Sequence, residues 1–398
     1  ADADIYVELV TPAYVVLEQV LAQGLSKDLL TDTVVFNALM DALVIGLETS
    51  LAEALAPAVV RAVVAKLEGN SNEIISSAAK ALDIENVSDE TIMNDLYTVA
   101  EAARIANELG IINTLVNKAE LQLTDAEGYA ELVAKVFEMN MVDAAFADVL
   151  VALVEAVANV DLSTTNLSNM DVEAEQATIV ELVRNGVLLA NSLGVETVKG
   201  VKPFAKDYLS AVKAAVADAK DLAKSKEYLE AVKVAFNAVV DPIREADTAV
   251  IKETLELVAE LQLVEEAGLE IYKQAIYSKL DGVLAVIGDV HDYTNEQFAE
   301  DLSVFVEIAD ILYDSKIYTV ITERTLPGEE CIPQLEEAVK LACELNIVEV
   351  KKADLEKVIN KLFKGRLEIA DVDYSQVNFA ADADIYVELV TPAYVVLE

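Results

Sequence analysis

Apolar residues recur at intervals of three and four along most of this chain, which is the spacing that places them on one face of an α-helix. The alternation of apolar and polar residues that a half-buried strand requires is nearly absent. In residues 142–157, apolar side chains occupy almost the whole helical circumference, so we expect that helix to be covered on several sides. The pattern predicts an all-α fold. Within residues 89–109 the apolar stripe consists of Ile92, Leu96, Val99, Ala103, Ala106 and Leu109.

Residues that cap helices punctuate this pattern. Serine or threonine followed three residues later by glutamate or glutamine is typical of a capping box at a helix start, and glycine or asparagine is typical of a helix end. Proline is favoured in the first helical turn. The predicted starts are Ser50 with Glu53, Thr124 with Glu127, Thr294 with Gln297, Thr11 with Pro12, Lys202 with Pro203, and Asp241 with Pro242; the predicted ends are Gly24, Gly69, Gly110, Gly194, Gly268, Asn140 and Asn346.

One sequence of 18 residues, ADADIYVELVTPAYVVLE, occurs twice without a single difference, at 1–18 and at 381–398. The two copies begin 380 residues apart. The simplest interpretation is one period of a 380-residue tandem repeat followed by the start of the next copy, and repetition on this scale indicates a structural role. We expect both copies to adopt one conformation, with Pro12 and Pro392 in a first helical turn. In the second copy Leu389, Val390, Tyr394, Val395 and Leu397 should be under-packed, because their partners belong to the following repeat.

A weaker repeat lies inside the period. Residues 100–111, 180–195 and 306–317 are each an apolar-striped helix with a polar end, and a second helix with a similar end follows at 137–141, 222–226 and 343–347. We therefore predict a tandem array of four small helical-bundle modules, joined by short ordered acidic linkers. Their limits are 1–83, 84–160, 161–288 with an extra helix pair, and 289–380, with 381–398 opening the next identical repeat. The period matches none of the tetratricopeptide, ankyrin or armadillo patterns.

The composition narrows the classes of partner. The chain has 29 basic and 71 acidic residues and a formal net charge of −42, so it repels phosphate, and we expect no nucleic-acid partner. Although 54% of the residues are hydrophobic, apolar runs such as residues 54–60 are short and end at charges, and we expect no membrane span in this segment. The hydrophobic content therefore belongs to broad buried helix faces or to contacts between copies.

No strong catalytic motif is present, and we predict no catalytic and no cofactor-binding residues. The single histidine, His291, lies in an acidic linker. Residues 371–382 resemble a calcium loop only in their aspartates, because Gln376 stands where glycine is needed and Asp382 where a bidentate glutamate is usual. Calcium bridging by the acidic linkers is a weaker hypothesis, with Asp371, Asp373, Asp382 and Asp384 as the candidate ligands.

The two cysteines, Cys331 and Cys343, are twelve residues apart. On one helix this spacing is about 15–18 Å, whereas a disulfide requires Cα atoms within about 7 Å. We expect two free thiols.

These features favour a non-catalytic structural protein: one repeat of a giant extracellular or cell-surface fibre, filament or stalk, whose partners are neighbouring copies of the same repeat and laterally associated chains. An intracellular helical scaffold or adaptor that binds partner helices is the alternative. A third interpretation is an enzyme or carrier domain whose matching ends were engineered. For the fibre, four modules of roughly 30 Å in line give a rise of about 120 Å per period.

Overall fold

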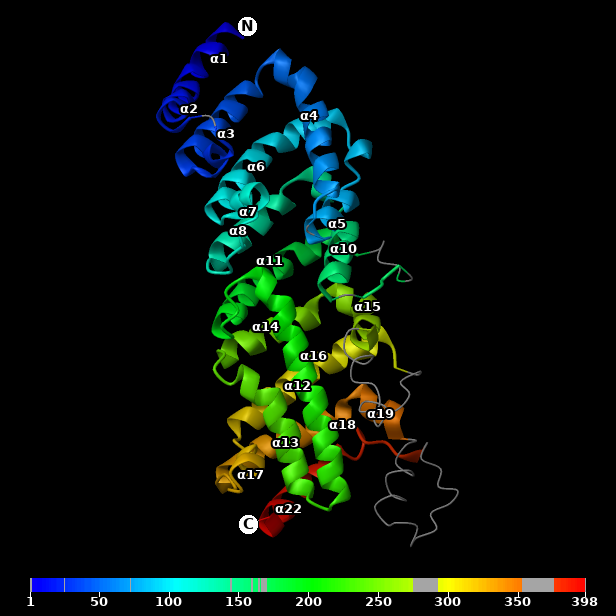
Figure 1. Cartoon of the computed structure of the whole chain (residues 1–398). Helices are drawn as coiled ribbons and strands as arrows, with labels where there is room; N and C mark the ends of the chain where they lie inside the picture. Colours follow the sequence, from blue (N-terminus) through cyan, green and yellow to red (C-terminus); the bar gives the residue numbers. More distant parts are fainter. Residues whose placement is uncertain are drawn as a thin grey trace. The chain divides into compact units, whose positions relative to one another are not determined.

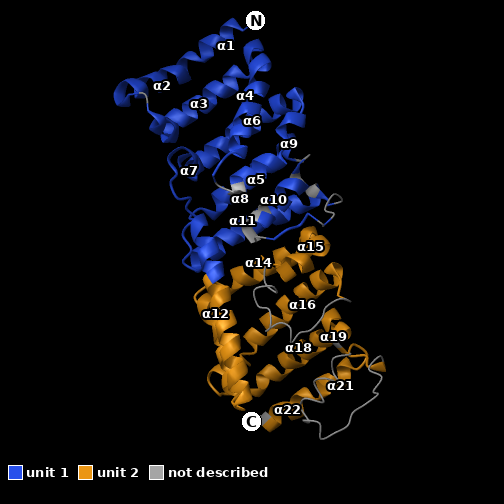
Figure 2. Cartoon of the chain, turned by 45° about the vertical axis from the view of Figure 1, so that its right-hand side comes forward, with its two compact units in different colours: residues 1–206 blue, residues 207–398 orange. Residues whose placement is uncertain are grey.

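The computed structural model describes residues 2–24, 26–71, 73–143, 145–158, 160–163, 165, 170–274, 293–352 and 376–397. Over these residues the chain is nearly all helical (Figure 1), and the prediction of an all-α fold is confirmed. The β-type pairing within them is an isolated antiparallel bridge between Gln122 and Thr197. The chain forms two compact units, residues 1–206 and 207–398, which are coloured separately in Figure 2. The division into four modules stays a prediction.

Unit 1 begins with two consecutive helices, α1 and α2, that both contact α3. From there the helices follow one another in a stack: α3 contacts α6, α6 contacts α8, and α8 contacts α11 (Figure 2). The helices of the unit are α1 (Ala3–Glu8), α2 (Val10–Gln23), α3 (Thr33–Gly46), α4 (Ser50–Glu68), α5 (Glu73–Ala81), α6 (Asp89–Glu108), α7 (Ile111–Asn117), α8 (Ala126–Phe137), α9 (Asn140–Asp143), α10 (Phe146–Ala158) and α11 (Val172–Ser192), with short 3-10 turns η1 (Lys27–Thr31) and η2 (Ile84–Asn86).

Helix α12 (Val198–Lys224) continues from unit 1 into unit 2, whose stack has the same logic. Helix α14 contacts α16, α16 contacts α18, and α18 contacts both α21 and α22. The remaining elements are α13 (Tyr228–Val240), η3 (Asp241–Ile243), α14 (Thr248–Glu260), α15 (Gln262–Tyr272), α16 (Asn295–Asp314), α17 (Thr319–Thr322), η6 (Glu329–Cys331), α18 (Ile332–Glu344), α19 (Asn346–Lys351), α21 (Ala383–Glu388) and α22 (Val390–Leu397). In stacks of this kind each helix is stabilised by its nearest neighbours along the stack.

A buried aspartate organises the same turn in each unit. The Asp95 side chain is 2% exposed; its Oδ1 accepts hydrogen bonds from the backbone N–H and side-chain amide of Asn140, at 3.1 and 2.7 Å, and its Oδ2 accepts one from the backbone N–H of Met141 at 2.8 Å. Asp301, 1% exposed, accepts the same three bonds from Asn346 and Ile347, at 2.7, 3.1 and 2.7 Å. Each carboxylate satisfies the free N–H groups at a helix start.

These aspartates correct one expectation. Asn140 and Asn346 begin α9 and α19 rather than ending the preceding helices. The two asparagines are not left-handed end residues, because their N–H groups are held from another helix by a carboxylate that lies 45 residues earlier in the chain. This distant partner has no local sequence mark, so a capping rule based on near neighbours misassigned both residues.

The matching turns belong to a longer equivalence between the units. Asp301 lies 206 residues after Asp95, and the same offset separates Asn346 from Asn140 and the start of α16 from the start of α6. Positive φ values recur at this offset as well, 78° at Gly110 with 56° at Lys316, and 57° at both Lys118 and Arg324. The similar sequences 100–111 and 306–317 thus lie at equivalent positions, over the end of α6 in unit 1 and the end of α16 in unit 2.

An ion pair recurs with its charges exchanged. In unit 1, Arg104 of α6 bonds to Asp41 of α3. In unit 2, the residue 206 positions after Arg104 is Asp310 of α16, and it bonds to Lys252 of α14. The partner residue also changes the sign of its charge, from Asp41 to Lys252, so the contact is attractive in both helix pairs. If α6 were paired with α14, or α16 with α3, like charges would meet at this position.

Some of the predicted helix starts and ends are confirmed by the structure and others are wrong. The capping box of Thr294 and Gln297 is confirmed, with both reciprocal bonds present. The other two boxes are wrong by one residue, because Thr49 caps α4 and Asp125 caps α8. Lys202 with Pro203 does not start a helix, since Pro203 lies inside α12, and Gly268 lies within α15 rather than at its end. Gly24, Gly110 and Gly194 do end helical segments with positive φ. Gly69 also follows the end of a helix, α4, but its φ of −88° is not left-handed, and Asp241 with Pro242 begins only the 3-10 turn η3.

We expect Asp301→Asn to destabilise unit 2 by about 2–4 kcal/mol, because an amide offers one oxygen where the carboxylate offers two and turns a donor toward backbone donors. Glu307→Gln, an exposed change on the same helix, is the matched control and should cost under about 0.5 kcal/mol. Urea unfolding followed by far-UV circular dichroism measures both. Equal losses of stability in the two variants would show that the buried carboxylate does not hold this turn.

Candidate functional site: the two faces of the duplicated segment

The two copies of the 18-residue segment fold in the same way, as expected. Helix α1 ends at Glu8 and α21 ends at Glu388; the chain then passes one residue, Leu9 or Leu389, and a second helix begins. The backbone angles at the break agree, with φ −64° and ψ −16° at Leu9 and φ −80° and ψ −15° at Leu389. Proline explains the position of the break, because Pro12 has no N–H to donate to the Glu8 carbonyl and its ring crowds that group. The second helix starts at Val10, with Pro12 in its first turn, so Thr11 is not the N-cap.

Although the conformation is shared, the two copies bury opposite faces. We call the first of these face A; it consists of Ile5, Leu9, Pro12, Val15 and Val16 in the first copy. In that copy these five side chains are buried or half-buried. In the second copy the same positions are exposed, with Val396 reaching 85%. They are Ile385, Leu389, Pro392, Val395 and Val396.

Face B shows the reverse. It consists of Ala3, Tyr6, Val7, Val10 and Tyr14, all of which are exposed in the first copy. In the second copy the corresponding residues are buried or half-buried, and the contrast is largest at the second tyrosine: Tyr14 is 65% exposed, whereas Tyr394 is 5% exposed. The corresponding residues are Ala383, Tyr386, Val387, Val390 and Tyr394.

The different buried faces test the prediction that apolar residues of the second copy are under-packed. Leu389 and Val395 are exposed, as predicted, and both belong to face A. Tyr394 was expected to be under-packed, and this is wrong, because it belongs to the face that α18 covers. Val390 is half-buried, and the side chain of Leu397 lies outside the described residues.

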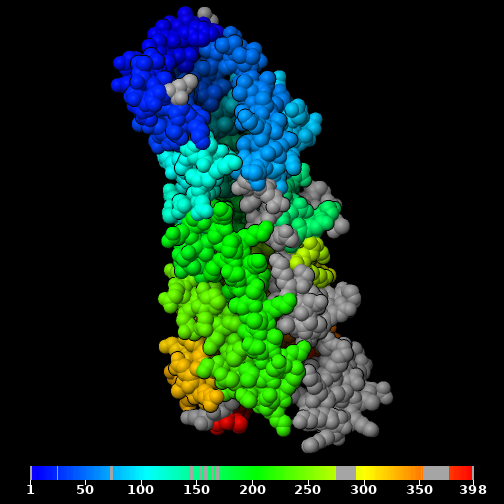
Figure 3. Space-filling model, in the orientation of Figure 1, coloured from blue at the N-terminus to red at the C-terminus, as the bar shows by residue number. Residues whose placement is uncertain are grey.

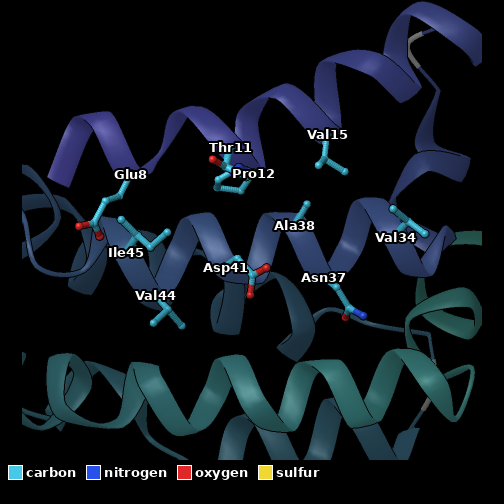
Figure 4. Close-up of a pocket in the computed structure, with 10 residues that line it drawn as sticks. All are labelled: Glu8, Thr11, Pro12, Val15, Val34, Asn37, Ala38, Asp41, Val44 and Ile45. Carbon is cyan, nitrogen blue, oxygen red and sulfur yellow. The ribbon is translucent and has the colours of Figure 1, made fainter. Parts of the chain in front are cut away.

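Face A of the first copy lies along α3 (Figure 4). Ala38 and Ile45 of α3 point toward the segment, whereas Asp41 points to the opposite side of the helix, where Arg104 of α6 pairs with it. A groove of about 610 Å³ runs along this seam. At the segment's start, the Asp2 carboxylate accepts a 3.0 Å hydrogen bond from the Ser50 hydroxyl in the first turn of α4. Figure 3 shows the segment, in dark blue, on the surface of unit 1.

Face B of the second copy lies against α18 and the turn that precedes it. The Tyr394 hydroxyl donates a hydrogen bond to the Pro327 carbonyl, and the Thr391 hydroxyl donates to Oε1 of Glu336 at 3.4 Å. The rings of Tyr386 and Phe379 pack with centroids 5.9 Å apart. Tyr394 therefore anchors the segment by both its ring and its hydroxyl.

A comparable junction occurs inside unit 1. Helix α8 of unit 1 is equivalent to α18 of unit 2, since their starts are 206 residues apart. Helix α11 packs against α8. The loop before α8 pairs with the chain that follows α11, since the Leu123 N–H donates to the Glu196 carbonyl at 2.8 Å and the Val198 N–H donates to the Leu121 carbonyl at 3.0 Å. Pro327 lies 206 residues after Leu121, so the equivalent carbonyl receives a later segment's donor in both units. Covering this helix with the next segment is thus a recurring contact of the fold.

The candidate calcium ligands are only partly visible. Asp371, Asp373 and also His291 lie outside the described residues. Asp382 is the residue before α21 and Asp384 lies in its first turn. Within the described part of the chain, no three or more histidine, cysteine, aspartate or glutamate side chains are grouped so as to hold a metal ion. Calcium binding by the linkers stays a prediction.

Both cysteines are free thiols, as their spacing indicated. Cys331 is buried at the start of α18 and Cys343 is half-buried near its end. Burial raises the pKa of each thiol, and the neighbouring carboxylates of Glu330 and Glu344 raise it further. A thiol with a raised pKa is largely protonated at neutral pH.

The first copy belongs to a longer apolar stretch that the short apolar runs in the sequence did not reveal. By length and composition, residues 3–23 are the one helical stretch among those described that reaches the apolar character of a membrane span, with a mean hydropathy of 1.4. Core helices and leader peptides share these properties. Here the hydropathy reflects apolar residues on two faces, and in the second copy α18 covers one of them.

Comparison of the chain with models of protein families, with curated proteins and with solved structures finds no match. Function must therefore be inferred from the geometry of the duplicated segment. That geometry consists of one sequence, one backbone conformation and two different buried faces.

The same substitution in the two copies should have unequal effects. We expect Tyr394→Ala to lower the stability of unit 2 by about 2–4 kcal/mol, because it removes a buried ring and its hydrogen bond. Tyr14→Ala changes an exposed side chain in identical local sequence and should cost under about 0.5 kcal/mol. Chemical unfolding of both variants tests this difference, and similar losses would mean that face B is not selectively buried in the second copy.

Proposed function

We propose that this protein is a non-catalytic structural protein built from tandem copies of the 380-residue repeat, in which the duplicated segment joins each copy to the next. The observation that carries the proposal is that the two copies bury complementary faces. In a longer array, face B of the segment packs on α18 of the copy before it, and face A packs on α3 of the copy that it opens.

The two contacts are compatible. None of the five positions of face A is also a position of face B, so one segment can satisfy α18 and α3 at the same time. Each contact is present in this chain, but on different copies of the segment. An engineered match between the two ends gives no reason for the faces to be complementary, whereas a continuous array requires it.

Direct packing of this kind makes a stiff junction. Two helices separated by one residue fill the space between α18 and the next α3, which leaves no flexible linker at this point. Repeats of four modules joined in this way would form an extracellular or cell-surface fibre, filament or stalk that transmits load through stacked helices. The acidic surface, with a net charge of −42, favours solubility.

Chains of two, three and four complete repeats test the proposal. Their lengths in negative-stain electron micrographs should increase by a constant increment per repeat, on the order of 120 Å for four modules in line. Repeats that scatter like beads on a flexible thread would contradict the proposal.

A substitution at the junction tests the same proposal locally. Tyr394→Asp, made in every internal copy of the segment, is expected to broaden the distribution of angles between repeats, because it places a charge against α18. The matched control is Glu388→Gln, an exposed polar change in the same segment, which should leave that distribution unchanged. Equal distributions for the two variants would show that the α18 contact does not stiffen the junction.

A further inference from the structure

The α18 surface recognises the duplicated segment through contacts that a separate chain can also supply. We propose that this surface is a receptor for the segment, and that when its own segment is displaced it binds face B of residues 1–18 from a second copy of this chain. The inference rests on the same two faces as the proposed function, but it concerns non-covalent binding of the segment between separate chains rather than continuity within one chain.

The occupant follows from sequence identity. The receptor consists of α18 and the turn before it, including the Pro327 carbonyl that accepts the hydrogen bond from Tyr394. Residues 1–18 carry every side chain that residues 381–398 use there, in the same helix–break–helix conformation. In the first copy those side chains are already exposed, since Tyr6, Val7, Val10 and Tyr14 are 48–69% exposed. Docking requires no refolding of the incoming segment.

Tethering explains why the intact chain favours the internal contact. A segment linked to its receptor has an effective concentration in the millimolar range, so a free segment of equal affinity competes poorly at ordinary protein concentrations. Weakening or removing residues 381–398 uncovers the α18 surface. Each 398-residue chain, or its shortened form, then has one uncovered α18 surface and one exposed face B in residues 1–18. Contacts of this head-to-tail kind propagate into linear oligomers.

Charge sets the expected salt dependence. The segment carries Asp2, Asp4, Glu8 and Glu18 and no basic residue, and the chain that receives it is strongly acidic as well. Electrostatic repulsion opposes the approach of two such chains, and salt screens this repulsion. Salt does not weaken the apolar contact between the segment and α18. Association should therefore become stronger as the salt concentration is raised, which is the reverse of an interface held by ion pairs.

The 398-residue chain with Tyr394→Asp provides the first test. In sedimentation velocity it should shift from one-chain mass to masses of two or more chains as its concentration rises, while the unchanged protein stays at one-chain mass. Adding Tyr14→Asp, which blocks face B of the first copy, should restore one-chain mass. Val396→Asp, on the exposed face A of the second copy, is the matched control and should leave one-chain mass unchanged.

A chain that ends at residue 380 is the second test, and it keeps the inference falsifiable if the aspartate variant loses its fold by circular dichroism. This shorter chain should associate, and an added peptide of residues 1–18 should dissociate it by filling the receptor. The inference is overturned if the Tyr394→Asp variant and the chain that ends at residue 380 both remain folded and monomeric. It is also overturned if they bind phosphatidylcholine vesicles through residues 3–23 without associating with each other. Regular spacing in linked repeats would still support the proposed function in that case, so the two failures are distinguishable.

Discussion

A helical segment that is apolar on two faces cannot be satisfied by one neighbour. Face A and face B of the duplicated segment lie on different sides of the same short helices, and α3 or α18 covers only one of them in this chain. Burial of apolar surface contributes roughly 25 cal/mol per Å², so each uncovered face is stabilising area that a further neighbour can recover. The duplicated segment therefore has one covered apolar face and one apolar face on which a further helix of the stack can pack.

Buried carboxylates give the stack its internal regularity. Asp95 and Asp301 hold the starts of α9 and α19 from the interior of α6 and α16, which ties the helices together at one point in each unit. Leaving those backbone N–H groups unpaired inside the protein would cost more than the carboxylate bonds gain, so the turn and the aspartate depend on each other. In unit 2 the Tyr293 hydroxyl also donates to Asp301, at 2.8 Å; burial raises the pKa of this tyrosine, and its bond to Asp301 raises it further.

Local rules in the sequence predicted the helices well and their neighbours poorly. Periodicity indicated the all-α class, the proline indicated the first turn of the second helix in the segment, and the Thr294 box is present as expected. The roles of Asn140 and Asn346 were missed, because the atoms that decide them come from 45 residues away. The duplication itself was visible, but which residues of each copy are buried was not: Tyr14 and Tyr394 have identical local sequence, and only the tertiary contact with α18 separates them.

Hydrogen exchange in a chain of two complete repeats, which carries the segment at the start, the middle and the end, tests the central claim most directly. Isotope labelling of one repeat at a time lets mass spectrometry distinguish peptides from the three copies, and because their amino-acid sequences are identical, the intrinsic exchange rates cancel. The middle copy should exchange at least about tenfold more slowly than either end copy, a difference of about 1.4 kcal/mol in opening free energy, because it alone is covered on both faces. A middle copy that exchanges as fast as the first one would contradict the account.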